Sequence, residues 1–315
     1  MTHRLKPNGR RVVPLLIFAL LALVPAATAI GADAFVLSLV TRIMIFGLAA
    51  MALDLLLGYG AMISFGHAAY VGIGAYSVGI LSSSGIDDVF VQIAVAFAAS
   101  GLFALVTGAI SLRTKGAYFI MITLAFGQML FFLASSLAAF GGDDGMTLPS
   151  RSLVFGAPIL KNTVVLYYAA FICLLGFYAL CRAIVASRFG RVLRGIRENL
   201  VRMEAIGFAP YPYKLAAYVI AGMIASVAGV LLANQAEFVS PAYAGWQRSA
   251  ELIFMVVLGG VGSLHGAIIG AALFVLLAEY LSRLTEYWPM IFGPLLILVV
   301  IFARGGIAGL LKAWR

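Results

Sequence analysis

Few residues that could carry out chemistry occur in this chain at a useful spacing. Its three histidines, His3, His67 and His265, lack the spacing of a metal-binding motif. Its two cysteines, Cys173 and Cys181, lie eight residues apart in one apolar stretch, which favours neither a metal site nor a redox pair. Neither HExxH nor GxSxG occurs. We therefore predict no catalytic residue, no metal site and no intramembrane enzyme.

An ATP-binding loop is also missing from the sequence. Gly190 and Gly195 have the glycine spacing of the Walker motif, but Ile196 stands where that motif requires lysine. The chain is therefore not expected to bind ATP or another cofactor.

Charged residues inside apolar stretches are few. Arg42 lies within one stretch and Glu251 opens another, whereas Asp54 and Glu279 fall near the expected cytoplasmic ends of helices. An ion-coupled carrier usually displays carboxylates near the middle of the membrane. The pattern therefore weighs against such a carrier, although backbone carbonyls can bind sodium without carboxylates.

A basic, amphipathic segment follows residue 187. From Arg191 onward, Val192, Ile196, Leu200 and Met203 form one apolar stripe at helical spacing, and the arginines lie away from it. Glu198 precedes Arg202 by four residues, the favourable order for an ion pair within a helix. The segment predicts a short helix over 188–207, ended by Gly207, that rests on anionic headgroups or docks onto a soluble partner.

Glycines are the second patterned feature. Gly262, Gly266 and Gly270 recur every four residues, which predicts one helix face for close packing. Residues 58–79 are dense in glycine, among them Gly72 and Gly74, and such density can break a helix inside the membrane. Broken segments at corresponding places, 58–79 and 249–270, point to a pathway between internal repeats.

The elements that must position these residues are membrane helices. The chain has 315 residues, of which 63% are hydrophobic and only 10% charged, with a mean hydropathy of +1.08. A soluble domain has about 25% charged residues, so the polar surface here cannot cover a water-soluble globule. This composition excludes a cytosolic enzyme, a secreted domain and a nucleic-acid-binding module. We predict an all-α polytopic membrane protein.

Ten segments are apolar enough to predict membrane spans of about 20 residues, with nine as the alternative. They are 13–31, 35–57, 61–83, 89–112, 116–140, 163–185, 212–234, 249–260, 263–282 and 287–304. The first also resembles a cleavable signal peptide, so the fate of residues 1–30 stays open. The eighth would reach only about 18 Å as a helix and is predicted to be a half-helix or a tilted span.

Lysine and arginine mark the cytoplasmic side of a membrane protein. Threading the chain with its N-terminus inside places residues 1–12, the basic loop at about 186–211 and residues 306–315 in the cytoplasm, and the acidic loops outside. Residues 13–305 then form a single transmembrane domain. Topology and contact with anionic lipid explain the net charge of +9 without nucleic acid.

Five blocks in order carry a resemblance to a known family. They are GYGAMISFGHAAYVGIGAY at 58–76, LRTKGAYFIMITLAFGQM at 112–129, GGDDGM at 141–146, SRFGRVLRGIRENLVRMEAIGF at 187–208 and ELIFMVVLGGVGSLHGAIIGA at 251–271. The chain resembles the permease subunits of ABC importers for branched-chain amino acids, specifically the M-type member of the permease pair. Departures from the family pattern are Gln128 for glutamate, Ala267 for proline and His265 for an aromatic residue.

The resemblance implies a type II-like ABC importer permease in the bacterial inner membrane, with two inverted-repeat halves. It also implies four partners: a paralogous H-type permease, two ATP-binding subunits that hold ATP and magnesium, and a binding protein outside the cell.

The resemblance assigns three groups of residues. Coupling to the ATPase falls to Arg191, Arg194, Ile196, Arg197, Glu198 and Gly207, with Ile196 filling a groove on the ATPase. The substrate pathway falls to Ser64, His67, Tyr70, Tyr118, Thr123 and Gln128. Helix packing falls to Gly72, Gly74, Gly262, Gly266 and Gly270.

Other functions stay open. Members of the same family carry urea, short amides or other amino acids, and the sequence does not exclude these cargoes. An ion-coupled carrier leaves the basic inner helix unexplained, and a passive channel lacks a filter-like sequence.

Overall fold

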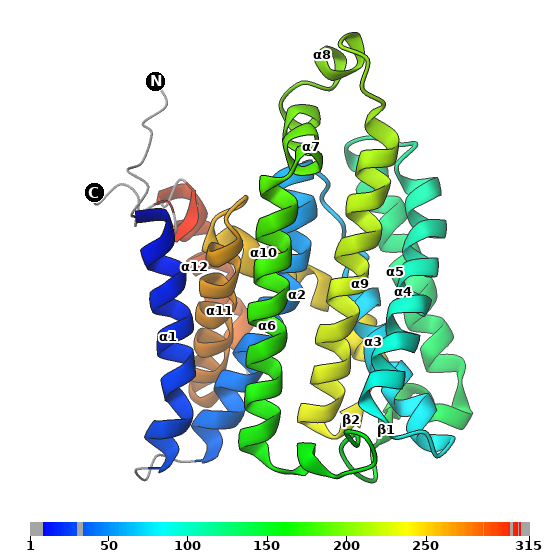
Figure 1. The fold of residues 1–315 in the computed structure, drawn as a ribbon, viewed down its shortest axis with the longest axis vertical. Helices are drawn as coiled ribbons and strands as arrows, with labels where there is room; N and C mark the ends of the chain where they lie inside the picture. The colour runs from blue at the N-terminus through cyan, green and yellow to red at the C-terminus, as the bar shows by residue number, and fades with distance from the viewer. Residues whose placement is uncertain (1–8, 30–33, 286, 303–304, 308, 310–315) are drawn as a thin grey trace.

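The computed structural model is a bundle of long helices (Figure 1). It describes residues 9–29, 34–285, 287–302, 305–307 and 309. Its helices are α1 (Gly9–Ala29), α2 (Ala34–Gly60), α3 (Ala68–Ser83), α4 (Val89–Ser111), α5 (Ala117–Ser136), α6 (Thr163–Ala186), α7 (Arg188–Glu198), α8 (Leu200–Ala205), α9 (Pro210–Ala236), α10 (Trp246–Gly259), α11 (Leu264–Leu284) and α12 (Trp288–Phe302). Two short strands, β1 (Met146–Thr147) and β2 (Phe238–Val239), pair antiparallel.

Each of the ten predicted spans overlaps one of these helices. Six helices are long and apolar enough to cross a membrane: α2, α4, α5, α6, α9 and α11. The apolar parts of α1, α3 and α12 are shorter. The prediction of a helix from residue 61 is wrong, because α3 begins only at Ala68.

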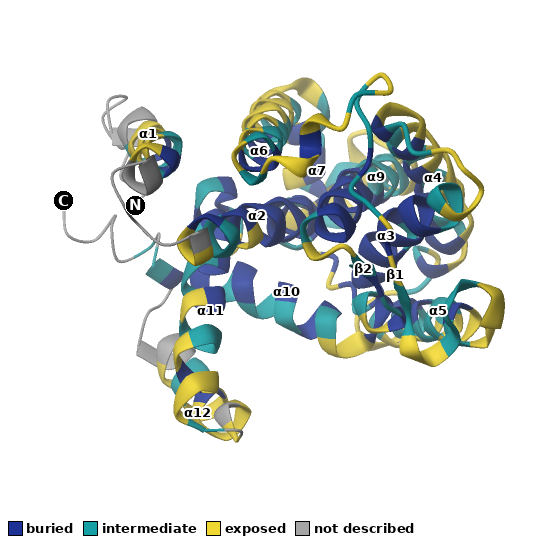
Figure 2. Cartoon of the chain, turned by 90° about the horizontal axis from the view of Figure 1, so that it is seen from below, coloured by how far each residue is buried: buried dark blue, intermediate teal, exposed yellow. Residues whose placement is uncertain are grey.

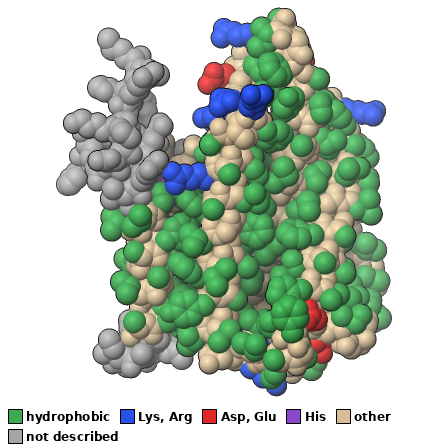
Figure 3. All heavy atoms as spheres, viewed as in Figure 1, with side chains coloured by type: hydrophobic (Ala, Val, Ile, Leu, Met, Phe, Trp, Pro, Cys, Tyr) green, Lys and Arg blue, Asp and Glu red, His purple; other side chains and the backbone are tan. Residues whose placement is uncertain are grey.

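The two ends of the bundle differ in charge. We call them the α7 end, which carries α7 and α8, and the β end, which carries β1 and β2. Figure 3 shows a wide apolar band across the middle of one face, with lysine and arginine side chains gathered at the α7 end. Such a band is what a bilayer requires of a protein surface that lies in it.

Helices α2 and α9 form the centre of the core, as Figure 2 shows. Helix α9 packs against α2, α3 and α4. Small residues let the backbones approach: a Cβ on Gly74 would lie 1.9 Å from the Ser226 carbonyl oxygen, and one on Gly229 would lie 2.0 Å from that of Val71. Helices α3 and α9 are therefore locked together at backbone distance.

Helices α3 and α10 each begin inside the bundle after an irregular segment. Residues 61–67 run back from the end of α2 to α3 and are visible in Figure 1 as a thin coil between α7 and α9. In the second half, Ser240 and the 3₁₀ turn Pro241–Ala244 lead from β2 into α10. The two starting points meet, since the Ala68 N–H donates a hydrogen bond to the buried Ser249 hydroxyl at 3.0 Å.

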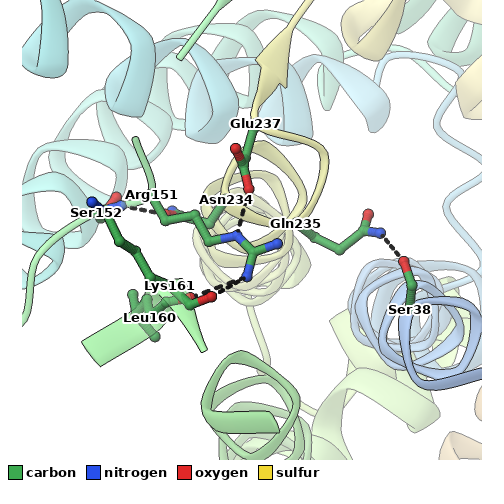
Figure 4. Close-up of polar contacts among 8 residues, drawn as sticks. All are labelled: Ser38, Arg151, Ser152, Leu160, Lys161, Asn234, Gln235 and Glu237. Carbon is green, nitrogen blue, oxygen red and sulfur yellow. Dashed lines mark hydrogen bonds and ion pairs between the residues drawn. The ribbon is translucent and has the colours of Figure 1, made fainter. Parts of the chain in front are cut away.

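The loop between α5 and α6 is tied down at the β end (Figure 4). Arg151 forms an ion pair with Glu237 at 2.9 Å and donates to the carbonyls of Leu160 and Lys161. The Ser152 N–H donates to the Asn234 side chain at 2.7 Å. Arg151 and Lys161 are basic residues at the end for which only acidic loops were predicted, so the charge pattern there is less strict than predicted.

Two predicted helical features take another form. The inner helix is not continuous over 188–207, because Asn199 ends α7 and caps α8, its side chain accepting from the Arg202 N–H at 2.9 Å. Gly262 does not lie on a helix with Gly266. It has a φ of +81° and forms the turn between α10 and α11. Residues 1–8 and 310–315 lie outside the described residues.

Candidate functional site

The junction of α3 and α10 gathers polar side chains in the interior of the bundle. Ser64, His67 and Tyr70 come from the first broken segment and the start of α3, and all three are completely buried. Ser249 joins them from α10. The structure therefore brings together three of the six predicted pathway residues.

His67 is the least satisfied member of this cluster. Its ring lies edge-on to the Tyr70 ring at 5.4 Å, and both its nitrogens are buried without a hydrogen-bond partner. The Tyr70 hydroxyl shares a hydrogen bond of 3.3 Å with Thr107. A buried polar group without a partner needs an explanation, since it costs about 1–3 kcal/mol.

Helix α5 crosses the first broken segment closely. The Phe65 N–H donates to the Thr123 hydroxyl at 3.3 Å, and a Cβ on Gly66 would lie 2.2 Å from the Thr123 carbonyl oxygen. Gln128 is half-buried and its amide nitrogen has no partner. Thr123 therefore borders the junction, whereas Tyr118 is 73% exposed at the start of α5.

A charged cavity lies on the other side of α10. It measures about 210 Å³ and lies between α2, α10 and α11. Its lining includes Arg42, Phe46, Arg248, Met255, Phe274 and Glu279. The sequence drew attention to Arg42 and Glu279 only one at a time and missed Arg248. Glu279 was expected near a cytoplasmic end, but it lies in the last turns of α11, beside Arg283, toward the β end (Figure 1).

Helix α7 is held onto the bundle by its own arginines. Arg194 donates to the carbonyls of Gly190 at 3.3 Å and Val185 at 3.2 Å, so it caps the last turn of α6. Ser187 begins the helix by accepting from the Gly190 N–H. Leu193 and Ile196 are buried under α7.

Ile196 does not present a free apolar surface. It is 3% exposed and lines a pocket with Met62 and Phe119. In this structure the apolar stripe of α7 therefore packs on its own chain, and a role of Ile196 in a groove of a partner stays a prediction. Arg191 and Glu198 are exposed.

The end of α8 agrees with the predicted helix end at Gly207. Gly207 has a φ of +90°, its N–H donates to the Glu204 carbonyl, and the Phe208 N–H donates to that of Met203. This pair of bonds is a Schellman motif, which favours glycine. The predicted Glu198–Arg202 ion pair is not formed in this described segment, because Asn199 interrupts the helix between them.

Arg197 connects α7 to the deeper parts of the bundle. Its guanidinium donates a hydrogen bond to the Gly58 carbonyl near the end of α2. One turn earlier, Asp54 accepts from the Gly262 N–H at 2.7 Å. A continuous set of contacts therefore runs from α7 through α2 to the turn that ends α10.

The predicted packing glycines are in tight contacts. A Cβ on Gly270 would lie 1.9 Å from the Met255 carbonyl oxygen, and one on Gly266 would lie 2.6 Å from that of Gly259. Gly72 approaches Ala244, and Gly262 approaches Gly58 from its turn. Helices α10 and α11 are therefore locked together in the same way as α3 and α9.

A multi-pass helical bundle with an apolar belt, interrupted helices and a basic segment at one end defines an integral membrane transport protein. Residues 35–300 match the family described as "Branched-chain amino acid transport system / permease component". The chain belongs to this family, and it is a transport permease component, not an enzyme.

Individual relatives agree with this assignment. The chain is 25% identical to the high-affinity branched-chain amino acid transport system permease protein LivM of Salmonella typhimurium, over 85% of this chain and 68% of that protein. It is 29% identical to LivH of Escherichia coli, over 84% of this chain and 91% of that protein. It is 28% identical to the autoinducer 2 import system permease protein LsrC of an Enterobacter species, over 75% of this chain and 68% of that protein. No solved structure matches the chain.

Proposed function

We propose that this chain is the M-type permease subunit of an ATP-driven importer for branched-chain amino acids. The family match over residues 35–300 is the observation that carries the proposal. The cargo named for LivM and LivH supports leucine, isoleucine and valine. The similarity to LsrC makes another small cargo, such as urea, a short amide or a different amino acid, the second candidate.

The proposed subunit crosses the bacterial inner membrane ten times. The α7 end, the N-terminus and the C-terminus are cytoplasmic. The arginines of α7 and α8 support this orientation, because cytoplasmic segments carry an excess of basic residues. With 14 residues, α10 reaches only about 21 Å. It therefore completes a crossing only together with the irregular segment before it.

The direction of the chain supports two inverted halves (Figure 1). Helix α2 runs toward the α7 end, and α3 returns from the interior to the β end. Helix α9 runs toward the β end, and α10 returns from the interior to the α7 end. The two halves are then α1–α5 and α6 with α9–α12. Inverted repeats of this kind place the substrate route at their interface.

Four partners complete the proposed importer. A paralogous H-type permease packs beside this chain, and two ATP-binding subunits dock at α7, bringing ATP and Mg²⁺. A binding protein delivers cargo at the β end. On this proposal the exposed Arg191 and Glu198 contact the ATPase, while Arg194 and Arg197 hold α7 in place.

Movement of α7 would reach the interior through Arg197, Gly58, Asp54 and Gly262. The contact between Ala68 and Ser249 is where the two locked pairs, α3–α9 and α10–α11, can separate. Opening there would expose a polar route for a zwitterion, formed by Ser64, His67, Tyr70, Thr123 and Gln128. Tyr118 would face the partner permease.

Uptake of labelled leucine tests this function. Cells with and without the gene would be treated with one poison that depletes ATP and, separately, with one that collapses the proton gradient. Gene-dependent uptake that stops only without ATP is the expected result. Uptake that stops with the gradient would contradict the proposal and favour an ion-coupled carrier. Uptake of urea or amides alone would support the second candidate.

A further inference from the structure

We propose that the cavity between α2, α10 and α11 is the site where this subunit holds an amino-acid zwitterion. Arg42 and Arg248 would bind its carboxylate, and the apolar wall would bind its aliphatic side chain. The inference rests on the proposed function, and it names a binding site within that function.

The charges around the cavity are unbalanced. Arg248 forms an ion pair with Glu251, and Arg283 forms one with Glu279 at 3.2 Å. Arg42 forms no ion pair with any described residue, and the Arg248 Nε is buried without a partner. Arg42, Arg248 and Glu279 line the cavity, and Glu251 and Arg283 pair with two of them, so three arginines accompany two glutamates. One bound carboxylate would complete the set, since it would pair with the exposed Arg42 and with the buried Nε of Arg248.

The two arginines converge from different helices. The guanidinium carbons of Arg42, on α2, and Arg248, on α10, lie 5.8 Å and 5.2 Å from the centre of the same Phe46 ring. Both positions favour a cation. Arginine also matches a carboxylate in geometry, since its guanidinium presents parallel N–H groups. Glu279 borders the same space and offers an acceptor for an ammonium group.

Apart from Ser282, the rest of the wall is apolar. Phe46, Met255, Phe274 and Val275 line it. The volume of about 210 Å³ exceeds the roughly 150 Å³ that holds a benzene molecule in an engineered cavity. An aliphatic side chain of four carbons therefore fits beside the charged groups. A cavity with charge on one wall and hydrocarbon on the other suits a branched-chain amino acid better than urea.

The site is also connected to α7, the helix proposed to contact the ATPase, through α10. Helix α10 supplies Arg248 and Met255, and its far end carries the turn that Asp54 holds through Gly262. A shift of α10 would separate Arg248 from Arg42 and release the carboxylate. Binding and release would then follow the movement of α7.

Photo-leucine, a leucine analogue with a diazirine, tests the site. The complete importer would be purified in nanodiscs, loaded through its binding protein, irradiated, and mapped by mass spectrometry. We expect label on α2, α10 and α11 around Phe46, Met255 and Phe274. We also expect Arg42→Met and Arg248→Met each to reduce this label and the uptake rate at least tenfold. Arg113→Met is the matched control, because it removes the same charge from an exposed residue that does not line the cavity.

The outcomes separate the two proposals. If the unsubstituted importer shows no ATP-dependent leucine uptake, the proposed function fails. If it transports leucine but the label lies only elsewhere, or persists in both arginine variants, the site is wrong. A phospholipid found in the cavity by native mass spectrometry, with no photo-leucine label, would also overturn it.

Discussion

Helices α3 and α10 are built on the same plan, yet they begin in different surroundings. Each follows an irregular segment and starts inside the bundle, where Ala68 and Ser249 join them. The start of α3 carries neutral, completely buried groups, Ser64, His67 and Tyr70. The start of α10 carries Arg248 and Glu251, which are partly exposed beside a cavity. On the account proposed above, the start of α3 closes the substrate route, and the start of α10 supplies charged groups that bind the substrate.

The two helices are alike in how they are anchored. Helix α3 is locked to α9 through Gly74 and Gly229, and α10 is locked to α11 through Gly270. Because neither helix can slide on its long neighbour, relative movement must occur between the two pairs. The predictions below test this division, beginning with the largest expected effect.

Filling the locked contacts should prevent folding in both halves. Gly74→Leu and Gly270→Leu each place side-chain atoms where a backbone oxygen lies 1.9 Å from a Cβ. We expect a tenfold or greater loss of protein from the membrane fraction, measured by immunoblot. Gly176→Leu is the control, since a Cβ there meets nothing within 4 Å. Normal levels of either locked variant would contradict the packing account.

Removing the hydrogen bond between Arg197 of α7 and Gly58 of α2 should affect transport more than folding. Arg197→Ala removes the hydrogen bond to Gly58, the first link toward α10. We expect normal membrane levels with leucine uptake reduced about tenfold in cells that express the whole importer. Arg202→Ala, which removes an exposed arginine of α8, is the control. Equal uptake in the two variants would show that the contact between α7 and α2 is not part of the coupling route.

The contact between the two helix starts should contribute measurably to stability. Ser249→Ala leaves the Ala68 N–H buried without its partner, which costs about 1–3 kcal/mol. We expect a lower midpoint of thermal unfolding for the purified subunit in detergent. Ser83→Ala, which alters an exposed hydroxyl on α3, should leave the midpoint unchanged. No difference between the variants would mean that this contact does not hold the junction.

The smallest effect on stability is expected at His67. His67→Leu removes a ring whose nitrogens have no partner, so no hydrogen bond is lost. Leucine removes the cost of the unpaired nitrogens, about 1–3 kcal/mol, but it also loses the ring contact with Tyr70, so the two effects offset. We expect an unchanged unfolding midpoint and uptake reduced about twofold by the loss of a polar group from the route. A large drop in the midpoint would show that His67 has a structural role.

Much of the fold could be predicted because long apolar segments and basic loops have local signatures. The long apolar helices follow from hydropathy, and the end of α8 follows from Gly207. The break at Asn199 was a missed local signal, since asparagine is a strong N-cap residue. The burial of Ile196 could not be predicted, because either face of α7 could pack on the bundle.

The charged cavity depended most on tertiary structure. Arg42 and Arg248 are far apart in sequence, and only the packing of α2 against α10 brings both to Phe46. Glu251 and Glu279 each had an ordinary explanation when considered alone. The pathway group was predicted better, because Ser64, His67 and Tyr70 lie within one short segment.

The central claim is that transport requires α3 and α10 to separate where they meet. Ala68→Cys combined with Ser249→Cys places two thiols at this contact, where the Ala68 backbone nitrogen and the Ser249 Oγ lie 3.0 Å apart. ATP-dependent leucine uptake by the reconstituted importer would be measured before and after oxidation, then after reduction, with each single-cysteine variant in parallel. The account predicts a loss of at least tenfold on oxidation, restored by reduction and absent from the single variants. Full uptake by a fully cross-linked importer would contradict it.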